Sequence, residues 1–410
     1  MFVQDFILNG QGHGEVGAVL GNVRFDPGIL RPYFDDEDGG RPCVTVNTGR
    51  REYNKETRRF EPVLENVRLS ELRDLGVESP VANATALRKE EWLELDKVVL
   101  RAARYRLRAW TDLAAANSYG GFNGMGKMIL EHETASDPGE AIQDMDGVAE
   151  GRDDAPIFQL EGVPLPITHA SFRISQRRLM ISRNTGTPLD TTLGEACGRR
   201  VAERIEKVTI GVNTGVVYGG ASTQQGGYGR TSQVYGYTNF TSRLTKTNLT
   251  VPTGSNASST LADVLAMRNS LYANKFYGPF MLYHSNDWDQ YMDNDYILTG
   301  GNVATQTLRQ RLKSIEGIMD VRRLDMLFGT QPSSSTGPGT DVDVSLKPYT
   351  LVMVQMTPDV ARAVNGMDIT TVQWEVKGGA ELRFRVMCIQ VPQLRADYYG
   401  NCGILHATTS

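Results

Sequence analysis

Cysteine and histidine are scarce in this 410-residue chain, which has four cysteines and five histidines. The cysteines form no CxxC pair, so we expect a reducing compartment without structural disulfides. The histidines have no HExxH spacing, and GxSxG and GxxxxGK[ST] motifs are absent. These absences exclude the familiar signatures of zinc hydrolases, serine hydrolases and P-loop nucleotidases. We therefore predict no catalytic set, no cofactor and no metal.

Long apolar runs are also missing, and none approaches the ~20 residues that span a bilayer. The first residues, MFVQDFILNGQG, lack the regions of a signal peptide. The net charge of −5 argues against bulk electrostatic binding to nucleic acid, although a local basic stripe stays compatible with it. A hydrophobic content of 40% indicates a folded protein, and the length predicts two or three lobes.

Residues 1–84 are rich in glycine and show little periodicity. We expect an extended arm with a few short strands and no core of its own. Gly12, Gly14 and Gly17 match GxGxxG, but Gly21 and Pro27 interrupt the chain before a helix of useful length can follow. A dinucleotide site needs that helix, so the motif does not predict one here.

Residues 85–116 predict one long helix that begins at Thr85. Apolar residues recur on one side at helical spacing, namely Trp92, Leu95, Val99, Ala103, Trp110 and Leu113. A basic stripe falls on the opposite side, formed by Lys97, Arg101, Arg104 and Arg108. The stripe is either a solvated helix face or a face that meets phosphate.

Residues 163–189 predict a two-stranded ribbon, because apolar and polar residues alternate in two phases. The segment carries Arg173, Arg177, Arg178 and Arg183, with no lysine and no acid. So few apolar residues cannot form a core, so the ribbon should lie on another, acidic surface. We expect Arg173→Glu plus Arg177→Glu to leave a folded subunit that cannot assemble.

A second long helix is predicted after Asp190, ending at Gly211. Its apolar stripe comprises Leu193, Cys197, Val201, Ile205 and Val208, which makes Cys197 a core residue rather than a reactive thiol. From residue 258 helices and strands alternate, with strands expected at 279–285, 318–327 and 349–357, a short helix at 358–366, paired strands around Gly378-Gly379 and a last strand at 401–407.

Acids cluster between residues 284 and 295, at His284, Asp287, Asp289, Asp293 and Asp295. The spacing fits no EF-hand frame, because the sixth position from Asp287 is Met292 rather than glycine. We interpret the cluster as a solvated helix start whose acids suit the helix dipole, with Trp288 and Met292 on the buried side.

The order of these elements resembles that of encapsulins and the major capsid proteins of tailed phages. The resemblance runs over residues 86–410 and is carried by LRKEEWLELDKVVLRAARYRL, PLPITHASFRIS, NTGTPLD, AERIEKVTIG and LADVLAMRNSLYANKFYGPFMLYHSNDWDQYM. It implies an α+β protein of the Hong Kong 97-type capsid fold, with an N-terminal arm, an extended β-ribbon E-loop, a peripheral domain with a long spine helix, and an axial α/β domain.

The resemblance also implies domain limits. They are 1–84 for the N-terminal arm, 85–162 for the first helix and peripheral strands, 163–189 for the E-loop, 190–257 for the spine helix and peripheral loop, 258–365 for the axial domain, and 366–410 for strands that return to the peripheral domain.

The function implied is that of a structural major capsid protein, not an enzyme. It would self-assemble into pentamers and hexamers of an icosahedral virion capsid around double-stranded DNA, in the host cytoplasm. The arm would clasp neighbouring subunits, the basic stripe would face the lumen, and portal, scaffold and cement proteins are candidate partners, with no membrane. We expect no E-loop lysine cross-link and no proteolytic removal of the N-terminus. The alternatives are an encapsulin-type shell loaded with a cargo enzyme and a soluble α/β enzyme.

Overall fold

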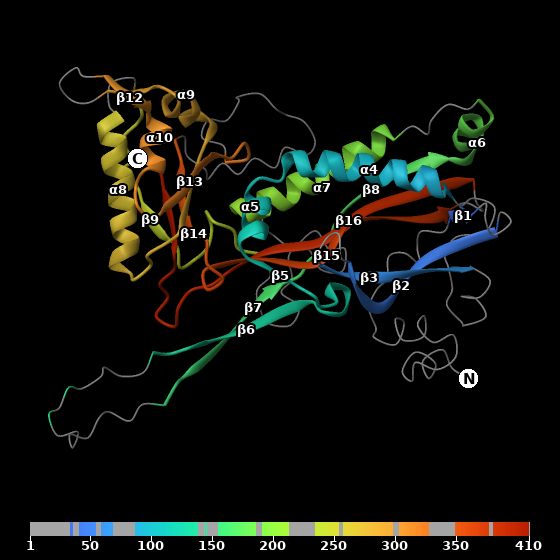
Figure 1. The fold of residues 1–410 in the computed structure, drawn as a ribbon, viewed down its shortest axis with the longest axis horizontal. Helices are drawn as coiled ribbons and strands as arrows, with labels where there is room; N and C mark the ends of the chain where they lie inside the picture. Colours follow the sequence, from blue (N-terminus) through green and yellow to red (C-terminus); the bar gives the residue numbers. More distant parts are fainter. Residues whose placement is uncertain are drawn as a thin grey trace.

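The structure is a computed structural model with two lobes and a projecting ribbon (Figure 1). It describes residues 33–35, 41–54, 59–68, 87–137, 143, 145, 155–185, 191–212, 234–253, 257–297, 303–327, 349–376 and 380–409. Most of the expected N-terminal arm and the loop after Gly211 therefore lie outside the described residues.

The elongated lobe is built on a four-stranded sheet with the order β5-β15-β16-β8. Its strands are β5 (Ser118–Gly120), β15 (Ala361–Val376), β16 (Glu381–Leu394) and β8 (Thr168–Ser175). β15 and β16 pair antiparallel, with Val376 opposite Glu381, which confirms the paired strands expected around Gly378-Gly379. The short helix expected at 358–366 is wrong, because residues 361–366 extend this long hairpin.

Helices α4 (Lys89–Arg106), α5 (Ala109–Ala116) and α7 (Thr192–Ile210) cover one face of this sheet (Figure 1). The apolar side predicted for the first helix is confirmed, since all six of its members are buried. The single helix expected over 85–116 is wrong, because the chain breaks between α4 and α5 around Leu107 and Arg108. α7 ends, as predicted, at Gly211, whose φ of 109° is left-handed.

α4 and α7 cross closely because two glycines face the contact. A Cβ on Gly198 would lie 2.8 Å from the Val99 carbonyl oxygen, and one on Gly194 would lie 2.7 Å from Leu95 Cδ1. Leu193, predicted in the buried stripe of α7, is instead 46% exposed. At the crossing with α4, Gly194 and Gly198 take the place predicted for Leu193, because glycine lets the two helix backbones approach closely.

The N-terminal region contributes a second sheet with the order β3-β2-β1-β4. Its strands are β1 (Tyr33–Asp35), β2 (Arg41–Asn54), β3 (Arg59–Arg68) and β4 (Leu87–Arg88). Tyr33 and Cys43 are buried in the same hydrophobic cluster as Trp92 of α4. β1 and β2 thus contribute to the core of their own subunit, which is compatible with the expectation that this region has no separate core.

The second lobe contains a five-stranded sheet with the order β13-β10-β14-β17-β9. Its strands are β13 (Ile318–Arg323), β10 (Phe280–His284), β14 (Leu351–Gln355), β17 (Ile404–Ala407) and β9 (Leu244–Lys246). The remaining elements are α8 (Ala257–Ala273), η4 (Asn286–Trp288), α9 (Asp289–Met292), β11 (Asp295–Ile297), β12 (Val303–Thr307) and α10 (Leu308–Lys313).

β10 joins the two lobes because both of its faces are buried. Phe280 and Leu282 belong to the core of the second lobe, whereas Met281 and Tyr283 belong to the core shared with the elongated lobe. Side chains alternate between the faces of a strand, so this continuous apolar run serves two cores.

The projecting ribbon consists of β6 (Ile129–Ala135) and β7 (Phe158–Pro164), which follow the short 3-10 turn η2 (Gly124–Gly126). The two strands pair antiparallel from Ile129 and Pro164 to Ala135 and Phe158. In Figure 1 they leave the body at its lower left, away from α6 (Gln176–Thr185).

The ribbon expected at 163–189 is therefore wrong. β8 is an edge strand that pairs with β16 over eight residue pairs, from Thr168–Cys388 to Ser175–Glu381, and residues 176–185 form α6. β16 supplies the partner strand, so β8 needs no second strand of its own. The expected return of 366–410 to the peripheral domain also fails at its end, because β17 pairs with β14 in the second lobe.

Candidate functional site

The outward face of the ribbon combines acids with large apolar side chains. Glu131, Glu133 and Asp137 occupy alternate positions of the β6 segment and are exposed. Leu160 lies opposite Glu133 and Phe158 opposite Ala135, so they share this face, and they are 47% and 63% exposed. Exposed apolar groups at such positions are typical of surfaces that another molecule covers.

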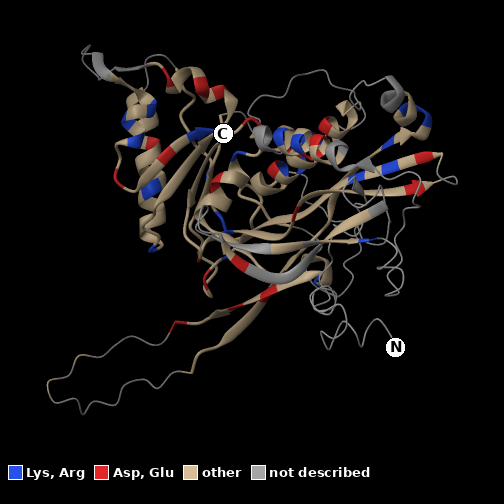
Figure 2. Ribbon diagram, turned by 45° about the vertical axis from the view of Figure 1, so that its right-hand side comes forward, with Lys and Arg blue, Asp and Glu red and all other residues tan. Residues whose placement is uncertain are grey.

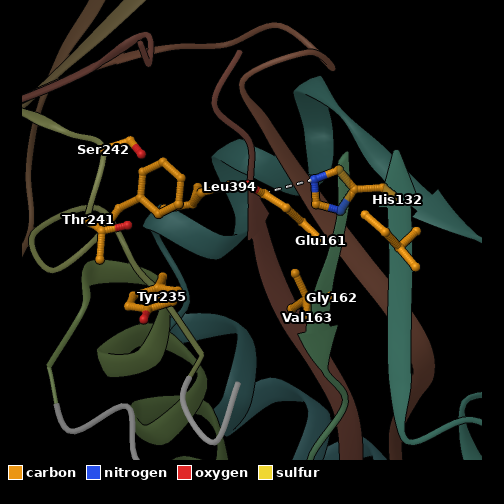
Figure 3. A pocket seen from close by; sticks show the side chains of 10 residues that line it. His132, Glu161, Gly162, Val163, Tyr235, Thr241, Ser242 and Leu394 are labelled. Atoms are coloured by element: carbon orange, nitrogen blue, oxygen red, sulfur yellow. Dashed lines mark ion pairs between the residues drawn. The ribbon is translucent and has the colours of Figure 1, made fainter. Parts of the chain in front are cut away.

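Residues of both strands, including His132, Glu161 and Leu160, line a cavity of about 370 Å³ beside the ribbon (Figure 3). His132 Nε2 lies 3.5 Å from Glu161 Oε2, and Gln393 Nε2 lies 3.1 Å from His132 Nδ1. Burial, together with Arg395 and Arg362, lowers the pKa of His132 to about 4, so the imidazole is neutral at pH 7 and forms no true ion pair. Thr241 and Ser242 line the opposite side of the cavity, so the geometry joins no hydroxyl to this imidazole.

The arginine end, which we define as β8 and α6 (residues 168–185), carries the basic residues predicted for 163–189. Arg173 is 73% exposed at its side chain and lies 3.7 Å from Glu381. Arg177 and Arg178 are exposed in the first turn of α6, and Leu179 is fully buried and anchors the helix. Met180 and Ile181 are exposed beside the arginines. The backbone of Arg183 lies on α6, and its side chain is outside the described residues. The structure thus places the four arginines on two consecutive elements at one end of the molecule.

The basic stripe of the first helix is divided by the break between α4 and α5. Lys97 and Arg101 lie exposed on α4, and Arg104 lies on the same helix with its side chain outside the described residues. Arg108 is exposed at the break and lines a surface hollow with Arg309 and Arg322. Three of the four predicted cations therefore have described side chains, and all three are exposed.

A buried carboxylate links α7 to α5. Glu206 is 2% exposed and accepts hydrogen bonds from the backbone amides of Ala109, at 2.7 Å, and Trp110, at 3.2 Å. These amides are orphan donors of a helix N-terminus, where a negative charge is favoured. Burial nevertheless outweighs the hydrogen bonds and raises the pKa of Glu206 to about 7.

The interlobe contact continues from α5 to the second sheet. Tyr283 of β10 donates a hydrogen bond to Asp112 Oδ2 at 3.1 Å, and Arg322 of β13 pairs with the other oxygen of Asp112. Tyr237 stacks on Tyr283 at 6.0 Å. Burial raises the pKa of both tyrosines, so both stay neutral, and Tyr283 keeps the proton that it donates to Asp112. The two lobes are thus joined by directional contacts that centre on the mostly buried side chain of Asp112.

The acidic cluster around residues 284–295 is held by arginines. Arg309 Nη2 lies 2.9 Å from Asp289 Oδ1, Arg323 Nη1 lies 2.8 Å from Asp289 Oδ2, and Arg309 also contacts Asp293 at 2.9 Å. Burial acts to raise the pKa of Asp289, but the hydrogen bonds from both arginines lower it overall. Trp288 and Met292 are fully buried, as predicted. The cluster is an ion-pair network rather than the solvated helix face that we expected.

Among the described residues, no group of three or more His, Cys, Asp and Glu side chains is arranged to hold a metal ion. Within the same part of the chain, no helix combines the length and apolar character needed to cross a membrane.

Sequence reasoning missed the ribbon and the role of Glu206. The ribbon had a usable signal, because ILEHETA and FQLEGVP alternate in character and flank a segment with one Pro-Gly and one Asp-Gly turn dipeptide. Glu206 had none, because it looks like any polar helix residue and its partners lie 96 and 97 positions away.

A family model described as a family of unknown function, DUF6260, matches residues 82–332. The chain belongs to the DUF6260 family. No curated protein matches the sequence of this DUF6260 member.

Solved structures resemble the DUF6260 chain in fold at low sequence identity. The capsid of Myoviridae phage XM1 is 9% identical, with a TM-score of 0.50 over 73% of this chain and 91% of that chain. A virus-like particle from Pyrococcus furiosus is 15% identical, with a TM-score of 0.46 over 78% of this chain and 99% of that chain. The capsid of a native GTA particle is 12% identical, with a TM-score of 0.46 over 74% and 91%. The similarity to the phage XM1 capsid shows that the DUF6260 chain has a mixed helix-and-sheet fold of the Hong Kong 97 capsid type.

Proposed function

We propose that this protein is a structural major capsid protein that assembles with copies of itself into an icosahedral shell. The observation that carries the proposal is the similarity in fold to the phage XM1 capsid protein, which extends over 73% of this chain and 91% of that chain. Fold alone does not determine function, so surface features must support the assignment.

Two surface features support it. The ribbon projects from the body with exposed Phe158 and Leu160, which a lone soluble subunit has no reason to display. The lobes are joined by a buried core and by the Tyr283–Asp112 and Arg322–Asp112 contacts, so the subunit is a rigid building block. We assign the E-loop role, contact with a neighbouring subunit, to the ribbon at 129–164 and the spine-helix role to α7.

The test is assembly of the purified full-length chain. Sedimentation velocity and negative-stain electron microscopy should reveal closed or partial shells, with capsomer-sized oligomers as intermediates. A monodisperse monomer at all protein concentrations and salt conditions, above all one with substrate turnover, would overturn the proposal in favour of a soluble enzyme.

The contents of the shell separate the virion capsid from the encapsulin-type alternative. We propose double-stranded DNA, because Lys97 and Arg101 form an exposed basic pair on α4 despite the net charge of −5. Shells isolated from their native source should contain nuclease-protected DNA. A single co-purifying enzyme in place of DNA would favour the cargo-loaded nanocompartment. Portal, scaffold and cement proteins remain candidate partners in this proposal, and mass spectrometry of those particles would identify them. Assembly in the host cytoplasm is also part of the proposal.

A further inference from the structure

A surface hollow lies where the two lobes meet, beside the break between α4 and α5. Its volume is about 480 Å³, which is within the range of roughly 300–1,000 Å³ that is usual for ligand sites. Arg108 lines it from the elongated lobe, and residues of α9, α10 and β13 line it from the second lobe. In Figure 2, basic and acidic residues gather where the second lobe approaches the helices of the elongated lobe. The hollow therefore belongs to neither lobe alone.

Positive charge dominates the lining of this hollow. The lining holds five cations against two carboxylates, and these residues are Arg108, Arg309, Lys313, Arg322 and Arg323, with Asp289 and Asp320. Three further acids contact the same arginines without lining the hollow, namely Asp112, Asp293 and Asp325. The excess of positive charge is therefore local. It favours an anion in direct contact with the lining and gives little attraction at long range.

Both lining carboxylates are shared between two cations. Asp289 lies 2.9 Å from Arg309 and 2.8 Å from Arg323. Asp320 lies 2.8 Å from Arg322 and also contacts Lys313. These contacts hold the basic side chains in place before a ligand arrives, which lowers the entropic cost of binding.

The arginines keep hydrogen-bond donors for a ligand. A guanidinium has three nitrogens with five N–H donors in a planar fork. Arg309 and Arg322 each contact two acids through Nε and one Nη, so the other amino group of each remains available. Arg108 makes no ion pair with any described residue, and Asp112 is already paired with Arg322. Guanidinium forks on a fixed frame suit the oxygens of a phosphate group.

We propose that this hollow binds a phosphate group that bridges the two lobes. Arg108 contacts the phosphate from the elongated lobe, and Lys313 and Arg322 contact it from the second lobe. The phosphate belongs either to a phosphodiester of DNA or to a free compound such as pyrophosphate, because both present the same oxygens. The site goes beyond the proposed function, since it is a property of the single subunit and needs no shell.

A phosphate at this position should hold the two lobes together. Asp112 already joins them through Tyr283 and Arg322, and a bound phosphate adds a second connection through Arg108. A ligand that binds the folded state and not the unfolded state raises the free energy of unfolding. We therefore expect pyrophosphate to raise the melting temperature of the dissociated subunit.

Titration of dissociated full-length subunits with sodium pyrophosphate at pH 7, without divalent cations, tests the site. Calorimetry should show one equivalent bound per subunit, and the melting temperature should rise above that in NaCl of the same ionic strength. Arg108→Gln and, separately, Lys313→Gln should each weaken binding about tenfold, because each removes a charge-assisted hydrogen bond. Arg199→Gln is the matched control, because Arg199 is exposed on α7 and its loss gives the same charge change outside the hollow.

The control separates a built site from general ionic attraction. A wild type that binds no pyrophosphate overturns the proposal, and so does equal weakening in Arg199→Gln and Arg108→Gln. Unchanged binding in both hollow variants also overturns it. Circular dichroism checks that each variant is folded, and Lys313→Gln carries the test from the second lobe if Arg108→Gln does not fold.

A short DNA duplex added as a competitor distinguishes the two sources of phosphate. Displacement of pyrophosphate by the duplex assigns the hollow to a phosphodiester of nucleic acid. Retention of pyrophosphate in the presence of bound duplex assigns it to a free phosphate compound, and the site stands in both cases. The readout needs no assembly, so loss of the site would leave the proposed function intact, and a wild type that never forms shells would leave the site intact.

Discussion

Glu206 on α7 caps the N-terminus of α5 by accepting a hydrogen bond from the Ala109 amide at 2.7 Å. The helix has no cap of its own, because the side chain of Arg108 makes no capping hydrogen bond. A residue distant in sequence therefore fixes where α5 begins. α5 in turn carries Asp112, which contacts Tyr283 and Arg322 of the second lobe, so this cap helps to set the angle between the lobes.

Glu206→Ala should destabilise the dissociated subunit by about 1–3 kcal/mol, because the buried amides of Ala109 and Trp110 lose their acceptor. Chemical denaturation at pH 6, followed by tryptophan fluorescence, measures this loss. Glu203→Ala is the control, because Glu203 makes only a 3.5 Å contact with the largely exposed Arg200 and should cost under about 1 kcal/mol. Equal losses in the two variants would contradict the capping role.

The same carboxyl group should make stability depend on pH. Its pKa is raised from an ordinary 4.5 to about 7, so the folded state holds a proton that the unfolded state releases. This contribution is fully present below pH 4.5 and is lost as the pH rises through 7. The stability advantage of the wild type over Glu206→Gln should fall by roughly 3 kcal/mol across that window. Other titrating groups, including the histidines, cancel in the difference, and a flat difference from pH 4.5 to 7.5 would refute the assignment.

The close crossing of α4 and α7 predicts that one added methyl group is costly. Gly198→Ala places a Cβ 2.8 Å from the Val99 carbonyl oxygen, so the helices must separate. We expect a loss of about 1–3 kcal/mol, although alanine favours helix over glycine elsewhere. Leu193→Ala, at a position 46% exposed, should lose less than about 1 kcal/mol. Thermal unfolding of the subunits compares the two, and a larger loss at Leu193 would restore the buried stripe that the sequence suggests.

Periodicity in the sequence was enough to predict helical structure in α4, α5 and α7 and the buried side of the first two, but not the break between them. The six apolar positions from Trp92 to Leu113 are buried, and the strands at Phe280 and Leu351 lie where the apolar runs predict them. The partner of a strand could not be predicted from spacing. β8 alternates like half of a hairpin, but it pairs with β16, more than 200 residues later.

Contacts between distant residues account for the other failures. The break between α4 and α5 depends on Glu206, and the inward face of α7 depends on the glycines that meet α4. The arginines that neutralise Asp289 come from α10 and β13, so local spacing suggested a solvated helix face instead. Position in three dimensions, rather than residue type, decided each of these sites.

The ion-pair network around Asp289 predicts insensitivity to divalent cations. Two arginines occupy its carboxylate oxygens, so millimolar Ca²⁺, Mg²⁺ or EDTA should leave the melting temperature of the subunit unchanged. Asp289→Asn should cost roughly 1 kcal/mol, because the partners are partly exposed. Asp293→Asn should cost less, since the side chain of Asp293 is 65% exposed. Stabilisation by Ca²⁺ that disappears in Asp289→Asn would reveal a metal site in place of the network.

The exposed cations of α4 provide a test of DNA as the shell content. Lys97→Gln plus Arg101→Gln removes two charges that can neutralise phosphates, and each such contact contributes about one to the slope of log K against log salt. We therefore expect the slope for duplex DNA binding by dissociated subunits to fall by roughly two, with assembly retained. Lys127→Gln plus Lys275→Gln, two exposed lysines elsewhere, should leave the slope unchanged. Equal slopes for the α4 pair and the wild type would mean that Lys97 and Arg101 make no contact with DNA phosphates. Loss of assembly in the α4 pair would instead make them a contact between subunits.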